Sequence, residues 1–195
     1  MDFVLRDEDA IVPEDVLCTV ANRVRGSIEA AKRDGAFRHD ELLRHFPLAS
    51  CGRASYLLAQ ALKEQGVDAI LVSGKYGDQN HMWLVVKDAL IMPSSYKPPE
   101  IPAELDGQLV QYGRPAREEE ELVKLYRCQD IAEGTIVDIT VDQFGEQEFR
   151  ERGVYVGKMN PFYKRFCDSY TRIEEYAGEL KGKDAGCFEI ISNYF

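Results

Sequence analysis

The sequence predicts one α+β domain in which helices pack on an antiparallel β-sheet. Residues 13–34 and 51–65 repeat apolar side chains at intervals of three and four, which is typical of helices with one buried face. Residues 81–86 and 135–141 are short runs of branched and aromatic residues, which indicate strands. The chain has 195 residues, 45% of them hydrophobic and 30% charged, as expected of a globular protein with a substantial core.

The helices have recognisable ends. Pro13 suits the first position of the helix predicted over 13–34, and Gly35 ends it. A short helix is expected over 40–45. Ser50 is a good N-cap for the helix over 51–65, which stops at Gly66.

The remaining predicted elements are mostly strands. The strand over 135–141 would place Val137, Ile139 and Val141 on one face and Asp138 and Thr140 on the other, because side chains alternate along a strand. A helix over 160–180 begins at Asn160-Pro161. We also expect strands over 67–73, 81–86, 89–92 and 154–156, a polar loop over 74–80, and a final strand or docked tail over 188–195.

Residues 93–133 interrupt this pattern. Five prolines and a charged helical stretch over 117–126 predict an insertion above the core, either a lid or substrate wall or a plain surface excursion. The interpretation is a single domain over 1–195, with a core at about 46–157 and the insertion at about 93–133.

Composition excludes several classes of function. The net charge of −10 argues against a general nucleic-acid binder, which needs a basic face. The longest apolar runs are only a few residues, so no membrane span is expected. The acidic N-terminus lacks a signal-peptide pattern, so a cytoplasmic location is the expectation. Five widely spaced cysteines without a CxxC pair, and only three histidines, predict neither a disulfide framework nor a metal site.

Cys51 is the candidate nucleophile. It begins the helix over 51–65, where the helix dipole and free amides favour a thiolate. The amides of Cys51 and Gly52 would be available to an oxyanion. The same spacing also puts Cys51 three residues before the buried Ala54, so an inert core cysteine is the alternative.

His81 and Asp138 complete a possible triad. An imidazole takes the thiol proton and later protonates the leaving group, while a carboxylate on its second nitrogen fixes the tautomer. Asp88 and Asp142 are weaker candidates for the carboxylate. Further oxyanion donors would come from Gln79, Asn80 or Gln143. Trp83 lies on the same face of the strand as His81, where it would either shield the His–Asp bond from water or simply pack in the core.

These motifs resemble the transglutaminase-like, Cys-His-Asp branch of the papain-like cysteine enzymes. The matching stretches are residues 50–55 around Cys51, 81–84 after His81, and 136–144 around Asp138. The resemblance covers about 46–157 and implies a cysteine on a helix, with the histidine and aspartate on neighbouring antiparallel strands. A long segment separates His81 from Asp138, so residues 93–133 must loop out between those strands.

What the resemblance implies is a thiol hydrolase or acyl transferase acting on an amide, of the peptidase, amidase or glutamine deamidase type. Its substrate would be a peptide, a protein or a small amide, and the chemistry needs no metal or organic cofactor. The alternative is a non-catalytic protein-binding module that retains the fold. Oligomeric state and substrate identity are left open by the sequence.

Overall fold

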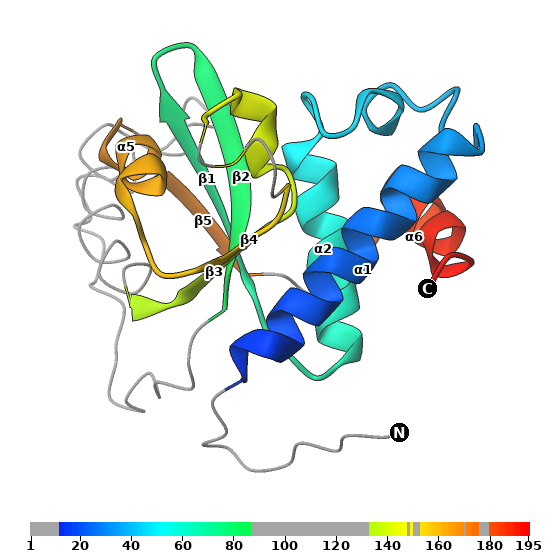
Figure 1. The fold of residues 1–195 in the computed structure, drawn as a ribbon, viewed down its shortest axis with the longest axis horizontal. Helices are drawn as coiled ribbons and strands as arrows, with labels where there is room; N and C mark the ends of the chain where they lie inside the picture. Colours follow the sequence, from blue (N-terminus) through cyan, green and yellow to red (C-terminus); the bar gives the residue numbers. More distant parts are fainter. Residues whose placement is uncertain (1–11, 87–132, 148, 150–152, 170, 176–179) are drawn as a thin grey trace, which may run out of the picture.

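The computed structural model describes residues 12–86, 133–147, 149, 153–169, 171–175 and 180–195. Within these ranges the chain is an α+β structure: helices cover both faces of one antiparallel sheet (Figure 1). The predicted strand over 89–92 and the predicted insertion, apart from Glu133, lie outside the described residues. Those two predictions stay predictions.

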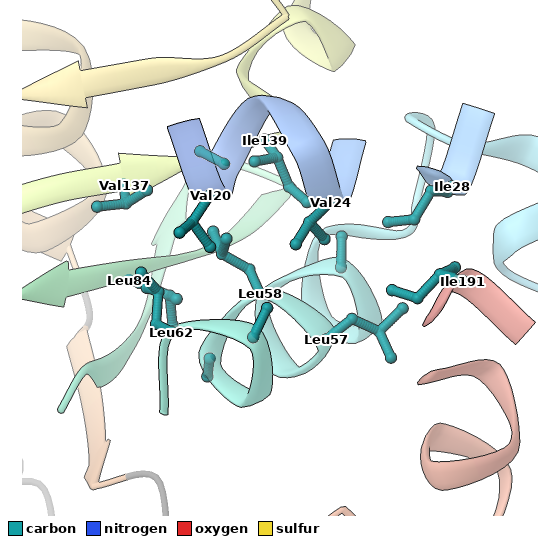
Figure 2. Close-up of a cluster of buried hydrophobic side chains, with 14 of the residues drawn as sticks. Val20, Val24, Ile28, Leu57, Leu58, Leu62, Leu84, Val137, Ile139 and Ile191 are labelled. Carbon is teal, nitrogen blue, oxygen red and sulfur yellow. The ribbon is translucent and has the colours of Figure 1, made fainter. Parts of the chain in front are cut away.

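Two helices, α1 (Glu14–Arg33) and α2 (Cys51–Glu64), cover one face of the sheet, and α6 (Lys183–Ser192) packs against them on the side away from the sheet (Figure 1). The first two match their predicted ranges closely. Their apolar stripes meet each other and the sheet, as Figure 2 shows for Val20 and Val24 of α1, Leu58 of α2 and Leu84 of the sheet. This helical cluster is the larger of the two buried cores.

The sheet has five strands in the order β4-β3-β2-β1-β5 among the described residues. Their bounds are Ile70–Tyr76 (β1), Gln79–Val86 (β2), Thr135–Asp138 (β3), Tyr155–Gly157 (β4) and Thr171–Glu175 (β5). All neighbours pair antiparallel. The two strands that were expected to share a sheet, β2 and β3, are direct neighbours, with Leu84 opposite Val137.

The prediction of a loop over 74–80 is wrong. The strands β1 and β2 continue through most of it, and Tyr76 pairs with Gln79 across a two-residue turn. Gly77, the first turn residue, has a φ of 58°, which glycine adopts without steric cost. This hairpin turn type needs a positive φ at that position, so one glycine replaces the expected loop.

The strand predicted over 135–141 is too long. It ends at Asp138, whose side chain accepts a hydrogen bond from the Thr140 amide at 2.8 Å and so turns the chain. A short 3₁₀ helix, η2 (Val141–Phe144), follows. Val141 therefore lies on the opposite side of the sheet from Val137 and Ile139, contrary to prediction.

The other face of the sheet carries α5 (Pro161–Ser169) and an aromatic cluster. The Asn160 side chain accepts the amides of Phe162 and Tyr163 and so begins the helix. The predicted helix over 160–180 ends early, because the chain turns back to form β5. The aromatic cluster comprises Trp83, Phe144, Phe149, Tyr155, Phe162, Tyr163 and Phe166.

Residues 188–195 were predicted as a final strand or a docked tail; most of them belong to a helix that docks on α1 and α2, so the strand alternative is wrong. In α6 the buried residues Cys187 and Ile191 are four apart, which is one helical face against α1 and α2. The short helix expected over 40–45 is a 3₁₀ turn, η1 (Leu43–His45). The Asp40 carboxylate accepts the amides of Leu42 and Leu43 at its start.

Candidate active site

Two side-chain hydrogen bonds to backbone carbonyls hold the loop before Cys51. The Lys32 ammonium donates to the Phe46 carbonyl at 2.6 Å, and the buried Ser50 hydroxyl donates to the Pro47 carbonyl at 2.9 Å. Ser50 holds the N-cap position as predicted, but its side chain does not cap the helix. The first amides of α2 thus have no side-chain cap, so they remain suited to negative charge.

Two ion pairs hold the N-terminus of α2 against its surroundings. The Arg53 guanidinium, two residues after Cys51, lies 2.5 Å from the Asp40 carboxylate and 2.6 Å from that of Asp184 in α6. The side chain of Arg53 is 13% exposed. Because buried ion pairs need good geometry to form, these contacts fix the direction of the helix that carries Cys51.

Cys51 lies against the first half of β2, at His81 and Met82. Its thiol is hydrogen-bonded to the His81 side chain and to the backbone amide of Met82. The Ser55 hydroxyl, one turn further along α2, donates to the carbonyl of the same Met82 at 3.1 Å. Residue Met82 of β2 thus ties the helix that begins at Cys51 to the strand that carries the imidazole.

The His81 imidazole is held by Asp138 on its other side. The distance from Nε2 to Oδ2 is 2.7 Å, and the two residues are 1% and 2% exposed. Since Nε2 is engaged by Asp138, Nδ1 is the nitrogen left for the thiol. The structure therefore brings all three predicted residues together, with the imidazole between thiol and carboxylate.

Two further residues bind Asp138 that the sequence interpretation missed. The Thr140 amide and hydroxyl donate to Oδ1 at 2.8 and 3.0 Å. The Tyr163 hydroxyl donates to Oδ2 at 3.0 Å. The D-x-T spacing was a usable signal for Thr140, since aspartate commonly bonds the backbone two residues on. Nothing in the sequence pointed to Tyr163, which comes from α5 on the aromatic face.

Gln143 is the one candidate oxyanion donor with a recorded contact at the imidazole. Its side-chain nitrogen lies 3.3 Å from His81 Nδ1, the nitrogen that faces the thiol. Gln79 and Asn80 begin β2 and are exposed. Of the weaker carboxylate candidates, Asp142 pairs with Arg25 instead, and Asp88 lies outside the described residues.

The electrostatics favour a charged pair. Burial raises the pKa of the Cys51 thiol, but the His81 hydrogen bond and charge outweigh burial and lower it overall. Burial likewise lowers the pKa of His81, but the Asp138 charge outweighs it and raises that pKa to about 9. At neutral pH the arrangement therefore favours a thiolate beside an imidazolium, whose charge the Asp138 carboxylate balances.

The aromatic cluster encloses the imidazole. The ring centroid of His81 lies 4.7 Å from that of Phe144, 5.4 Å from Trp83 and 5.6 Å from Phe166. Trp83 is fully buried, so it contributes to the core and also keeps water from the ring. Exclusion of water strengthens the His–Asp interaction, because the local dielectric falls.

Cys51 differs from the other described cysteines. It is half-buried and is not a member of either hydrophobic core cluster, unlike Cys167 and Cys187. Burial and the Asp40 charge raise the pKa of Cys187 to about 11. Burial and nearby carboxylates also raise the pKa of Cys18. Of these three thiols, Cys18, Cys51 and Cys187, only Cys51 has an environment that lowers its pKa and so favours a thiolate.

No protein-family model matches the chain, and neither a curated protein nor a solved structure matches it. Among the described residues, no group of three or more His, Cys, Asp or Glu side chains is arranged to hold a metal ion. In the same part of the chain, no helix combines the length and apolar character that a membrane crossing requires.

Proposed function

We propose that the protein is a thiol hydrolase or acyl transferase that acts on an amide bond, with Cys51 as nucleophile. The observation that carries the proposal is the position of His81. Its buried imidazole is hydrogen-bonded to the Cys51 thiol and, at 2.7 Å, to the Asp138 carboxylate. An inert core cysteine has no need of this arrangement, whereas nucleophilic catalysis requires it.

The reaction follows from these contacts. The Cys51 thiolate attacks the carbonyl carbon of the substrate, and the C=O electron pair moves onto oxygen. The tetrahedral intermediate collapses to a thioester as the C–N bond breaks, and the His81 imidazolium gives its Nδ1 proton to the leaving amine. Water then attacks the thioester while His81 takes its proton, which releases an acid and restores the thiol. An amine in place of water completes a transfer.

The oxyanion would be stabilised at the start of α2. The amides of Cys51 and Gly52 lie in the first turn, where the helix itself supplies no acceptor. A Cβ placed on Gly52 would meet no other atom within 4 Å, so the space beside it is open. The Gln143 side-chain amide would be a third donor, because its nitrogen lies 3.3 Å from Nδ1 of His81.

The order of the elements also supports the resemblance to the transglutaminase-like branch of papain-like enzymes. Cys51 begins a helix, and His81 and Asp138 lie on adjacent antiparallel strands, β2 and β3. The order along the chain that supports the resemblance is therefore a cysteine on a helix, then a histidine on a strand, then an aspartate on the neighbouring strand. A peptide, a protein or a small amide remains the proposed substrate.

Limited alkylation tests the proposal. Substoichiometric iodoacetamide at neutral pH, with the labelled peptide identified by mass spectrometry, should modify Cys51 first among the five cysteines. His81→Ala should slow the labelling strongly because the base is lost. Asp138→Asn should slow it less, since the imidazole remains. A Cys51 that reacts only after denaturation would overturn the proposal and favour the non-catalytic binding module.

A further inference from the structure

We propose that Arg25, in the middle of α1, is a positioning residue of this site. It fixes the turn that joins Asp138, which contacts Nε2 of His81, to Gln143, whose side-chain nitrogen lies near Nδ1. The inference rests on the proposed function and extends it to a helix outside the stretch that resembles the papain-like enzymes.

The contacts of Arg25 bracket the turn. Its Nη1 donates to the carbonyl of Ile139, the residue after Asp138, at 2.7 Å. Its Nη1 and Nη2 bind both carboxylate oxygens of Asp142, the residue before Gln143, at 2.9 Å each. The guanidinium therefore holds the first and last residues of the 139–142 segment at the same time.

A third segment closes the arrangement. Arg25 Nη1 also donates to the Gly153 carbonyl at 2.6 Å, and the guanidinium carbon lies 5.3 Å from the centre of the Phe46 ring. Gly153 has a φ of 60°, and a Cβ built on it would lie 2.4 Å from the Arg25 guanidinium carbon. The chain thus leaves room for the guanidinium at a position where a larger residue would displace it.

The turn needs such support because the sheet does not continue into it. The β3 ladder ends at Asp138, and Asp142 and Gln143 belong to the short helix η2. The Arg25 side chain is only 14% exposed, so its bonds to this segment compete little with water. If the turn shifts, Asp138 and Gln143 move relative to the ring between them.

The planar fork of arginine is required by this geometry. A bidentate pair with a carboxylate plus two carbonyl bonds uses several N–H donors in fixed directions. Lysine would keep the charge at this position but would supply one compact ammonium in place of the fork. The proposal therefore predicts that Arg25→Lys slows Cys51 alkylation nearly as much as Arg25→Met does.

The test follows the rate of Cys51 alkylation by iodoacetamide against pH in the full chain, at a temperature well below unfolding. Arg25→Met and Arg25→Lys should each lower the rate at neutral pH by about tenfold and raise the midpoint of the pH profile by about one unit. Asp142→Asn, which keeps one acceptor oxygen, should show a smaller shift of the same sign. Thermal unfolding of each variant is recorded in parallel.

Glu29→Gln is the matched control. Glu29 pairs with Arg25 Nε at 2.9 Å from the next turn of α1 and is 47% exposed, so its loss leaves the bonds to the turn in place. Its pH profile should equal that of the wild type. If neither arginine variant folds, the pH profile of Cys51 alkylation in Asp142→Asn is compared with that in Glu29→Gln. A shift in Asp142→Asn alone supports the proposal, and equal profiles contradict it.

The outcomes separate the two proposals. A reactive wild-type Cys51 whose profile is unchanged in the Arg25 and Asp142 variants, even if those variants melt earlier, would reduce Arg25 to a structural residue and leave the proposed function standing. A wild-type Cys51 that resists alkylation in the folded protein would overturn both.

Discussion

The Tyr163 hydroxyl and the His81 imidazole meet at one carboxylate oxygen. Both approach Oδ2 of Asp138, at 3.0 and 2.7 Å, while Thr140 occupies Oδ1. The Asp138 side chain is buried, and a buried carboxylate is stable only when its oxygens are satisfied. Although burial raises the pKa of Asp138, the His81 charge and the donors outweigh it and lower that pKa.

Tyr163→Phe should show how much the hydrogen bond from Tyr163 to Asp138 contributes to stability. The change removes the hydroxyl and keeps the ring, so the carboxylate loses one donor in a site that water does not reach. We expect the free energy of unfolding, measured by urea titration, to fall by about 1.5–3 kcal/mol, the usual range for a bond to a charged group. Tyr155→Phe is the control, because its hydroxyl donates to the exposed Lys158 carbonyl. Equal losses in the two variants would contradict the prediction.

Gln143→Ala should separate attack from oxyanion stabilisation. Alkylation of Cys51 by iodoacetamide passes through no oxyanion, so its rate should change little. Acylation by a p-nitrophenyl ester does, so the burst of nitrophenol should slow by about 10²–10³-fold if the amide is a donor. Gln79→Ala, on the exposed start of β2, is the control. A burst unaffected by Gln143→Ala would remove this residue from the oxyanion site.

The free energy of unfolding should depend more strongly on pH in Cys51→Ala than in the wild type. His81, with a pKa of about 9 when folded against an ordinary 6.5, binds a proton that the unfolded chain releases between those values. Its contribution to stability is therefore present below 6.5 and lost as pH rises through about 9. The lowered pKa of Cys51 acts in the opposite sense, so the two offset each other in the wild type.

Removal of the thiol takes away the opposing Cys51 effect and the smaller part of the rise in the pKa of His81, while Asp138 still supplies the larger part. The free energy of unfolding of Cys51→Ala, from urea titrations, should fall with pH across this window more steeply than that of the wild type. One proton limits the difference to about 1.4 kcal/mol per pH unit. The double variant Cys51→Ala/His81→Gln should lose the slope. Parallel curves for all three proteins would argue against the assigned charges.

Gly74→Ala should disturb the site through α5. Gly74 lies opposite His81 in the hairpin, and a Cβ there would come within 2.8 Å of the Phe166 Cβ and 2.9 Å of its carbonyl oxygen. Backbone of α5 must move to make room, at a cost of about 1–3 kcal/mol by urea titration. Since α5 also carries Tyr163, Cys51 alkylation should slow as well.

Gly26→Ala provides the comparison for this variant. A Cβ at Gly26, inside α1, meets nothing within 4 Å, so the same substitution should stabilise the protein by about 0.5–1 kcal/mol. Destabilisation of equal size in both variants would mean that the close approach at Gly74 has no special effect.

The sequence predicted the elements whose signals are local. The long apolar stripe and Gly35 located α1, and the branched run after His81 located β2. The contacts of Cys51, His81 and Asp138 were expected because each residue lay in the right kind of element. The resemblance supplied their relative order, which periodicity alone does not contain.

The remaining elements depend on long-range packing. In α6 only Cys187 and Ile191 are buried, which is too thin a pattern to reveal a helix. The end of β3 depends on a side-chain bond between Asp138 and Thr140, which alternation of apolar residues does not report. Tyr163 reaches Asp138 only because α5 folds back across the sheet, so its role is a property of the tertiary structure.

The double tie at Met82 makes one amide a sensor of the thiol. Its N–H donates to Cys51, while its carbonyl accepts from Ser55 of the same helix. Any chemistry that turns the sulfur into a poorer acceptor, such as alkylation or thioester formation, changes the partner of that proton without touching β2. The ¹⁵N–¹H signal of Met82 should then move in a titration with a thiol-directed reagent, and it would report the state of the Cys51 sulfur as the reaction proceeds.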